Sequence, residues 1–195
     1  MGDLWEVRPV DLAAARTACR RLPERQPPRP GITADLTGRA EAARAWRADA
    51  RQDGDGPQPA LTMLTTSHVR ALRRIIEVHG WPGFGLVGAE GSLAALEIAL
   101  LCGEATFLRR LLRVMEVPLR NGEAVPVFRL LLHDRACVLE GQRQWYGTQQ
   151  QVRPPGAGVL WPVEEPGLLA VRRADAGFEP LVGAVFHEPA AQTAA

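Results

Sequence analysis

Apolar residues in the middle of this 195-residue chain recur at intervals of three and four. This spacing places them on one face of an α-helix, where they can pack against other helices. Proline and glycine interrupt the pattern, because proline cannot continue a helix and glycine often follows one. Helices are predicted over residues 66–79, 92–101, 107–115, 126–135 and 165–176. The pattern therefore predicts a mainly α-helical protein with a single helical domain.

The first 60 residues have the poorest apolar periodicity. Two helices are predicted there, over residues 11–22 and 33–51, separated and followed by segments rich in proline and glycine. We expect residues 1–60 to form an N-terminal helical arm that is peripheral to a core domain of residues 61–188, and residues 189–195 to be a frayed tail. Two short extended runs around Gly141 predict one small β-hairpin near residues 137–147.

Charge and cysteine content exclude several classes of protein. Because 22 acidic residues nearly balance 23 basic ones, no nucleic-acid or membrane partner is expected. Every basic residue is arginine, which excludes lysine Schiff-base and P-loop lysine chemistry. The three cysteines are far apart, and the histidines lack metal-binding spacing, so neither a disulfide framework nor a metal site is predicted. Lacking a signal peptide or a membrane span, the chain is expected to be cytoplasmic.

Two short motifs carry candidate catalytic residues. His79 ends the predicted helix 66–79 on its apolar stripe, so it is either a core or capping histidine or a general base at a pocket wall, with Trp81 beside it. Asp134 could act as an acid or base and Arg135 as an anion clamp, or the two could be an ion pair at a helix end. Residues 83–88 match a dinucleotide-binding spacing, but a helix precedes them where that motif needs a strand, so no nucleotide cofactor is expected.

Residues 144–149 concentrate hydrogen-bonding side chains around a glycine. Burying such side chains costs free energy unless the protein or a ligand supplies partners. Composition alone does not separate a structural network from a ligand site. The side chains concerned are Gln144, Tyr146, Thr148 and Gln149.

In order along the chain, these motifs resemble a bacterial domain-of-unknown-function family. The resemblance covers residues 75–181 and comprises HGWP at 79–82, Gly88, the Phe107 to Met115 helix, Asp134-Arg135, the Q-x-Y-G-T-Q string at 144–149 and Arg172-Arg173. It implies where a site lies but implies no reaction. Where the family has a Gln-His pair, this chain has Leu100-Leu101, so the resemblance implies a less polar site or a loss of catalysis.

These observations lead to two hypotheses of different classes. The first is a small-molecule pocket in a metal-free, cofactor-free lyase, isomerase or hydrolase, in which His79 or Asp134 transfers a proton. The second is a non-catalytic binding or scaffold protein, in which the same residues form a buried network that holds the hairpin on the helices. If these side chains converge on an open cavity, the first hypothesis is favoured. If their hydrogen bonds are satisfied by one another without a cavity, the second is favoured. The residues expected to line the pocket are His79, Trp81, Asp134, Arg135, Gln144, Tyr146, Thr148 and Gln149.

Overall fold

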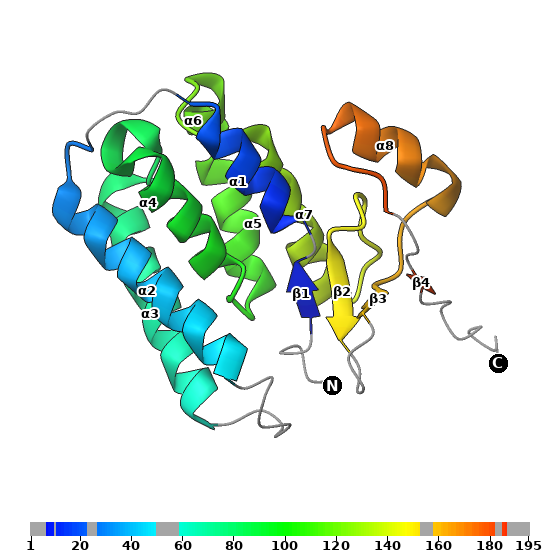
Figure 1. Ribbon diagram of the computed structural model, residues 1–195, viewed down its shortest axis with the longest axis horizontal. Helices are drawn as coiled ribbons and strands as arrows, with labels where there is room; N and C mark the ends of the chain where they lie inside the picture. Colours follow the sequence, from blue (N-terminus) through cyan, green and yellow to red (C-terminus); the bar gives the residue numbers. More distant parts are fainter. Residues whose placement is uncertain are drawn as a thin grey trace.

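A layer of helices with a small sheet at its edge makes up the computed structural model of the chain (Figure 1). The structure describes residues 7–9, 11–22, 27–49, 59–152, 158–181 and 185–186. Its helices are α1 (Leu12–Arg20), α2 (Pro30–Asp49), α3 (Pro59–His79), α4 (Phe84–Ala99), α5 (Ala105–Val114), α6 (Glu116–Arg120), α7 (Pro126–Leu139) and α8 (Leu169–Asp175), the last preceded by the 3-10 turn η2 (Pro166–Leu168). The prediction of a mainly helical fold with one small hairpin is confirmed.

Helix α4 lies at the centre of the helical layer and packs against α1, α2, α3 and α7 (Figure 1). Residues 94–100 are all buried, and every one of them except Glu97 is apolar, as expected for a helix surrounded by others. A Cβ atom at Gly91 would lie 2.7 Å from the Cβ of Val87 in the preceding turn and 3.3 Å from the Thr33 methyl group of α2, so glycine is needed within α4 and also lets α2 approach. Small side chains on α4 therefore set how closely the helices of the layer pack.

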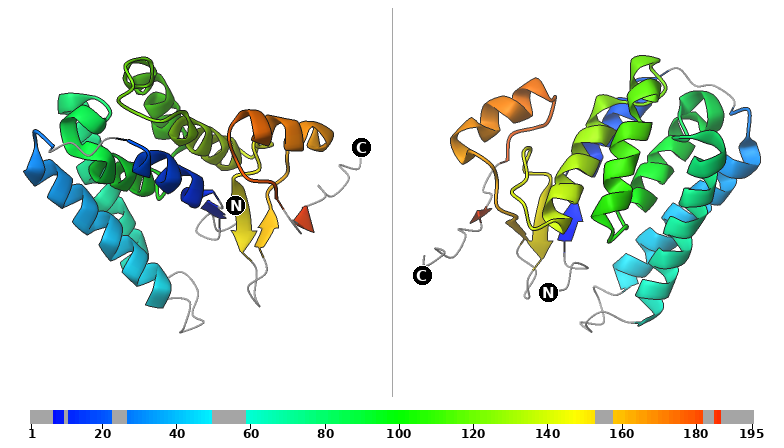
Figure 2. Two further views of the ribbon diagram at one scale, coloured as in Figure 1. Left: turned by 45° about the horizontal axis from the view of Figure 1, so that its top comes forward. Right: turned by 180° about the vertical axis from the view of Figure 1, so that it is seen from behind.

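The sheet contains the strands β1 (Val7–Pro9), β2 (Gln149–Val152), β3 (Gly158–Leu160) and β4 (Val185–Phe186), in that order. Strands β1, β2 and β3 pair antiparallel, and β4 pairs parallel to β3. Figure 2 shows the sheet beside one end of the helical layer, with α8 beyond it. The β2–β3 pair is the hairpin. Gln149, the last residue of the string at 144–149, begins β2, so this string leads into the sheet beside the N-terminal strand β1.

The predicted position of the hairpin is wrong. The hairpin does not occupy residues 137–147, because Cys137 and Val138 are buried in the last turn of α7 and the first hairpin strand begins only at Gln149. A short apolar run satisfies a buried helix as well as a strand, which explains the error. Residues 50–58 and the predicted tail, residues 189–195, lie outside the described residues.

The described N-terminal residues are part of the core and do not form a peripheral arm. Ala15 and Cys19 of α1 and Leu36 and Ala40 of α2 are buried within the main apolar cluster. Alanine contributes little to an apolar pattern, yet it packs closely. The apolar periodicity therefore underestimated how much of these two helices is buried. In the part of the chain that the structure describes, no helix has the length and apolar character needed to span a bilayer.

Candidate functional site

Asp134 lies in α7 at the centre of the polar residues that the sequence singled out, and it is completely buried. Its carboxylate accepts hydrogen bonds from the backbone N–H groups of Trp145 (2.8 Å), Tyr146 (3.0 Å) and Thr148 (3.1 Å). The Thr148 hydroxyl donates a further bond of 3.0 Å. Both carboxylate oxygens are therefore occupied by the segment that leads into β2. Asp134 fixes that segment to α7.

The two glutamines of the string form a second, interlocking set of bonds. The Gln144 side-chain amide donates to the carbonyl oxygens of Gln149 and Trp161, both at 2.8 Å, and its carbonyl accepts the Gln149 backbone N–H at 2.8 Å. The Gln149 side chain donates to the Thr148 hydroxyl at 3.2 Å. Gln144, Thr148 and Gln149 are all fully buried. These side chains join the segments before β2 and after β3, as backbone ladder bonds would.

Arg173 of α8, which belongs to the family's Arg-Arg pair, ties the C-terminal segment to the same region. It is 2% exposed and forms a bidentate ion pair with Asp11, with nitrogen–oxygen distances of 2.9 and 3.0 Å. It also donates to the backbone carbonyl oxygens of Tyr146 and Glu179. Bidentate arginine–carboxylate pairs are geometrically specific. This one joins the segment before α1 to α8, 162 residues later in the chain.

Tyr146 contributes mainly its ring and its backbone. The half-buried ring packs against His133 and Phe178, with ring centroids 6.4 and 6.2 Å away. Arg135, the other half of the Asp-Arg motif, is buried next to Asp134 in sequence. Burial lowers the pKa of Arg135 to about 10, and the positive charge of Arg47 acts in the same direction. Arg135 nevertheless stays protonated at neutral pH.

The HGWP motif does not place its histidine as expected. His79 ends α3 but is exposed, although Leu72 and Ile76 on the same stripe are buried. Gly80, with φ +73°, follows as the left-handed residue after the helix. Trp81 is 3% exposed and packs edge-on against Phe128, 6.3 Å between centroids. The core placement of His79 is therefore wrong, whereas its predicted position at the helix end agrees with a capping role, and Trp81 is a core residue.

A cavity with a volume of about 620 Å³ lies elsewhere, between α1, α2 and α4. None of the eight predicted pocket residues lines it. Its apolar wall includes Cys19, Leu22, Phe84, Val87 and Leu93, and Arg16, Arg20, Thr33 and Glu90 add polar groups. Burial raises the pKa of the Cys19 thiol to about 11, so the thiol is protonated at neutral pH.

No sequence signal identified this cavity, because its walls come from three helices that are distant in sequence. Gly88, which the resemblance to the family singled out, is the wall residue that comes nearest to such a signal. It lines the cavity and interrupts α4 with φ +71°, a conformation that favours glycine. The buried Glu97 of α4 pairs with Arg16 of α1 at 3.0 Å and with Arg44 of α2 at 2.5 Å. These ion pairs hold the three helices that form the walls.

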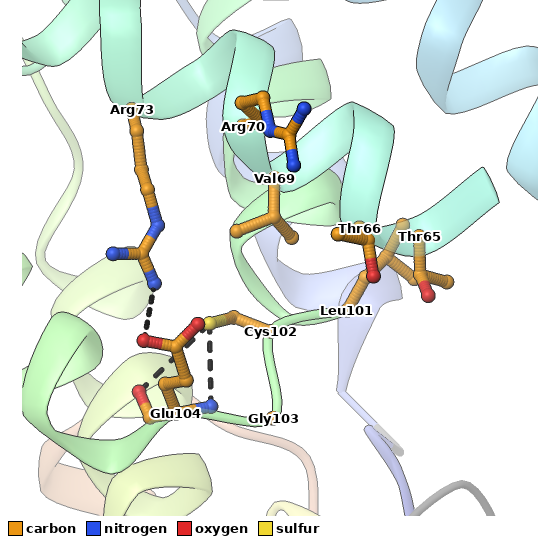
Figure 3. A pocket seen from close by; sticks show the side chains of 9 residues that line it. All are labelled: Thr65, Thr66, Val69, Arg70, Arg73, Leu101, Cys102, Gly103 and Glu104. Atoms are coloured by element: carbon orange, nitrogen blue, oxygen red, sulfur yellow. Dashed lines mark hydrogen bonds and ion pairs between the residues drawn. The ribbon is translucent and has the colours of Figure 1, made fainter. Parts of the chain in front are cut away.

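A smaller cavity of about 230 Å³ lies between α3 and the segment 101–104 (Figure 3). Arg73 of α3 reaches across to Glu104, with 2.7 Å between charged atoms. Leu101 lines this cavity at the position where the resembling family has its histidine, and Cys102 lies beside it. Within the described residues, no group of three or more His, Cys, Asp or Glu side chains could hold a metal ion.

The chain was compared with known protein families, curated proteins and solved structures. The profile of a family described as a family of unknown function (DUF6624) matches residues 30–188, which is most of the chain. The match begins at the first residue of α2 and includes every motif that carried the resemblance. No curated protein and no solved structure matched.

Proposed function

The chain belongs to the DUF6624 family of unknown function, and we propose that it is a non-catalytic small-molecule-binding protein. In this proposal the polar family motif is a scaffold, and the ligand binds in the cavity between α1, α2 and α4. The observation that carries the proposal is the saturation of Asp134, whose two oxygens accept bonds from three backbone N–H groups and one hydroxyl. A general base needs a free lone pair within reach of the substrate proton, and Asp134 offers none.

The position of His79, the other residue proposed to transfer a proton, also argues against catalysis. His79 is exposed at the end of α3, whereas Asp134 is buried in α7, and neither lines either cavity. Catalytic groups must reach one substrate together. The scaffold hypothesis therefore explains these polar residues better than the enzyme hypothesis.

The cavity between α1, α2 and α4 suits a small amphiphilic ligand. Its volume of about 620 Å³ lies within the range of roughly 300–1,000 Å³ that is typical of small-molecule sites. Leu22, Phe84 and Leu93 would surround an apolar body, and Arg20 would lie near an anionic end, since Arg16 is already paired with Glu97. Because the Cys19 thiol stays protonated, it is a poor nucleophile and adds packing surface.

A thermal-shift screen against a broad panel of amphiphilic acids tests the proposal, because a ligand that binds only the folded state raises the melting temperature. Ala89 lines the cavity, so Ala89→Leu reduces its volume, and Ala42→Leu on the exposed face of α2 is the matched control. We expect hits to stabilise the parent and Ala42→Leu equally and Ala89→Leu much less.

Three results would contradict the proposal. Equal stabilisation of Ala89→Leu would place the ligand outside this cavity. Enzymatic turnover of a hit that is lost in His79→Ala would restore the enzyme hypothesis. A panel without any hit would count against ligand binding itself.

For location, the free thiols Cys19, Cys102 and Cys137 support a reducing compartment, which agrees with the cytoplasm.

A further inference from the structure

Cys137 of α7 differs from the other two cysteines in the groups around its sulfur. The Arg109 guanidinium of α5 lies 3.6 Å from Sγ. One turn earlier in α7, the His133 ring nitrogens lie 3.8 and 4.0 Å from the same sulfur. Two cationic side chains from two helices thus contact one thiol. Positive charge next to the sulfur is the usual setting of reactive cysteines.

The groups that face this cluster keep both side chains in place. The Glu140 carboxylate pairs with Arg109 at 2.7 Å, and the Asp134 carboxylate lies 3.5 Å from His133 Nδ1. Hydrogen bonding to Asp134, then to Cys137, raises the pKa of His133 to about 9, so the ring is an imidazolium at neutral pH. A cation is therefore present beside the sulfur throughout the physiological range.

The other cysteines provide internal comparisons. Burial raises the pKa of the Cys19 thiol to about 11. Burial also raises the pKa of the Cys102 thiol, although Arg73 opposes the shift. Neither has an imidazolium against its sulfur among the described contacts. Cys137 is buried as well, but the side chains that cover it, Arg109 and His133, are themselves 30% and 26% exposed. The cluster therefore lies just below the protein surface, under two side chains that solvent reaches.

We propose that Cys137 is a modification site that reacts with small hydroperoxides to form a sulfenic acid. The thiolate sulfur attacks the terminal peroxide oxygen, so an S–O bond forms while the O–O bond breaks. The sulfur loses two electrons, the peroxide gains them, and the leaving hydroxide or alkoxide takes a proton from the His133 imidazolium. Arg109 then lies next to the sulfenate oxygen. This site is independent of the ligand-binding cavity, so either proposal can fail without the other.

The test is exposure of the folded protein to hydrogen peroxide with a carbon-acid trap for sulfenic acids, followed by peptide mapping. Trypsin cleavage after Arg135 and Arg143 isolates Cys137 in the peptide 136–143. We expect trapping at Cys137 to be at least about tenfold faster than at Cys19 or Cys102. Unfolding the protein in urea should make the three rates alike, since the selectivity depends on the folded surroundings.

Variants separate the cluster from mere accessibility. His133→Gln and Arg109→Gln should each slow trapping at Cys137 by about fivefold or more, because each removes one neighbouring cation. Arg113→Gln, on the exposed face of the same α5, is the matched control and should change nothing. Equal trapping at all three cysteines of the folded protein would overturn the proposal. So would unchanged trapping in both cluster variants, with melting temperatures confirming that they are folded.

Discussion

Replacing Asp134 by asparagine tests whether the polar family motif is structural. The substitution keeps the size of the side chain but replaces one acceptor oxygen by an NH₂ group. If the remaining oxygen stays with the Thr148 hydroxyl and the backbone N–H groups of Tyr146 and Thr148, the new NH₂ group faces the Trp145 N–H. Two donors then oppose each other in a fully buried place.

The magnitude follows from these bonds. Stranding the buried Trp145 N–H costs about 1–3 kcal/mol. The other three bonds change from charge-assisted to neutral, which weakens each by about 1 kcal/mol. Removing a buried negative charge offsets part of this loss, because burying a charge itself carries a desolvation penalty. We therefore expect Asp134→Asn to lower the free energy of unfolding by about 3 kcal/mol.

Equilibrium unfolding in urea, followed by tryptophan fluorescence, measures this difference. The control is Asp175→Asn in the exposed last turn of α8, for which we expect a change below about 0.5 kcal/mol. A stability of Asp134→Asn within about 1 kcal/mol of the parent, at an unchanged slope against urea, would refute the reasoning. Asp134 would then be free for the acid–base role that the sequence also allowed.

Four further outcomes are expected. Deleting residues 1–20 should lower the melting temperature steeply or abolish the cooperative transition, since α1 is part of the core. Tyr146→Phe should change the urea-unfolding free energy by less than about 0.5 kcal/mol, because the described contacts of Tyr146 involve its ring and backbone. By the same measurement, Leu100→Gln in the core should cost about 2–4 kcal/mol, and Leu101→His at the half-buried rim of the smaller cavity about 1 kcal/mol. His133, whose pKa rises to about 9 on folding, should contribute stability below pH 6.5 that is lost as pH rises to 9, a dependence of the urea midpoint that His133→Gln should remove.

The helical core could be predicted because its signal is local. Leu108, Leu111 and Leu112 recur at helical spacing within α5, and glycine or proline marks most helix ends. The N-terminal helices were underestimated for the opposite reason. Ala15 and Ala40 are buried in helices that pack against α4, and the sequences of α1 and α2 alone do not indicate that partner. Periodicity measures how apolar a face is, whereas close packing depends on the shape of two faces together.

The role of buried polar residues is the hardest feature to predict from a sequence. Gln144, Thr148 and Asp134 have the kind of side chain that a ligand site would use. For that reason the string at 144–149, which contains two of them, was predicted to be part of a site. The same donors and acceptors can satisfy one another, and the difference depends on distances that only the fold sets. Here the β2–β3 hairpin is short, so backbone ladder bonds alone hold few of its residues. Side chains that imitate a ladder, as Gln144 does between Gln149 and Trp161, extend the hairpin and fix it to α7 through Asp134. A family motif can therefore preserve how a small sheet is attached, and in our proposal binding takes place at a separate site, the cavity between α1, α2 and α4.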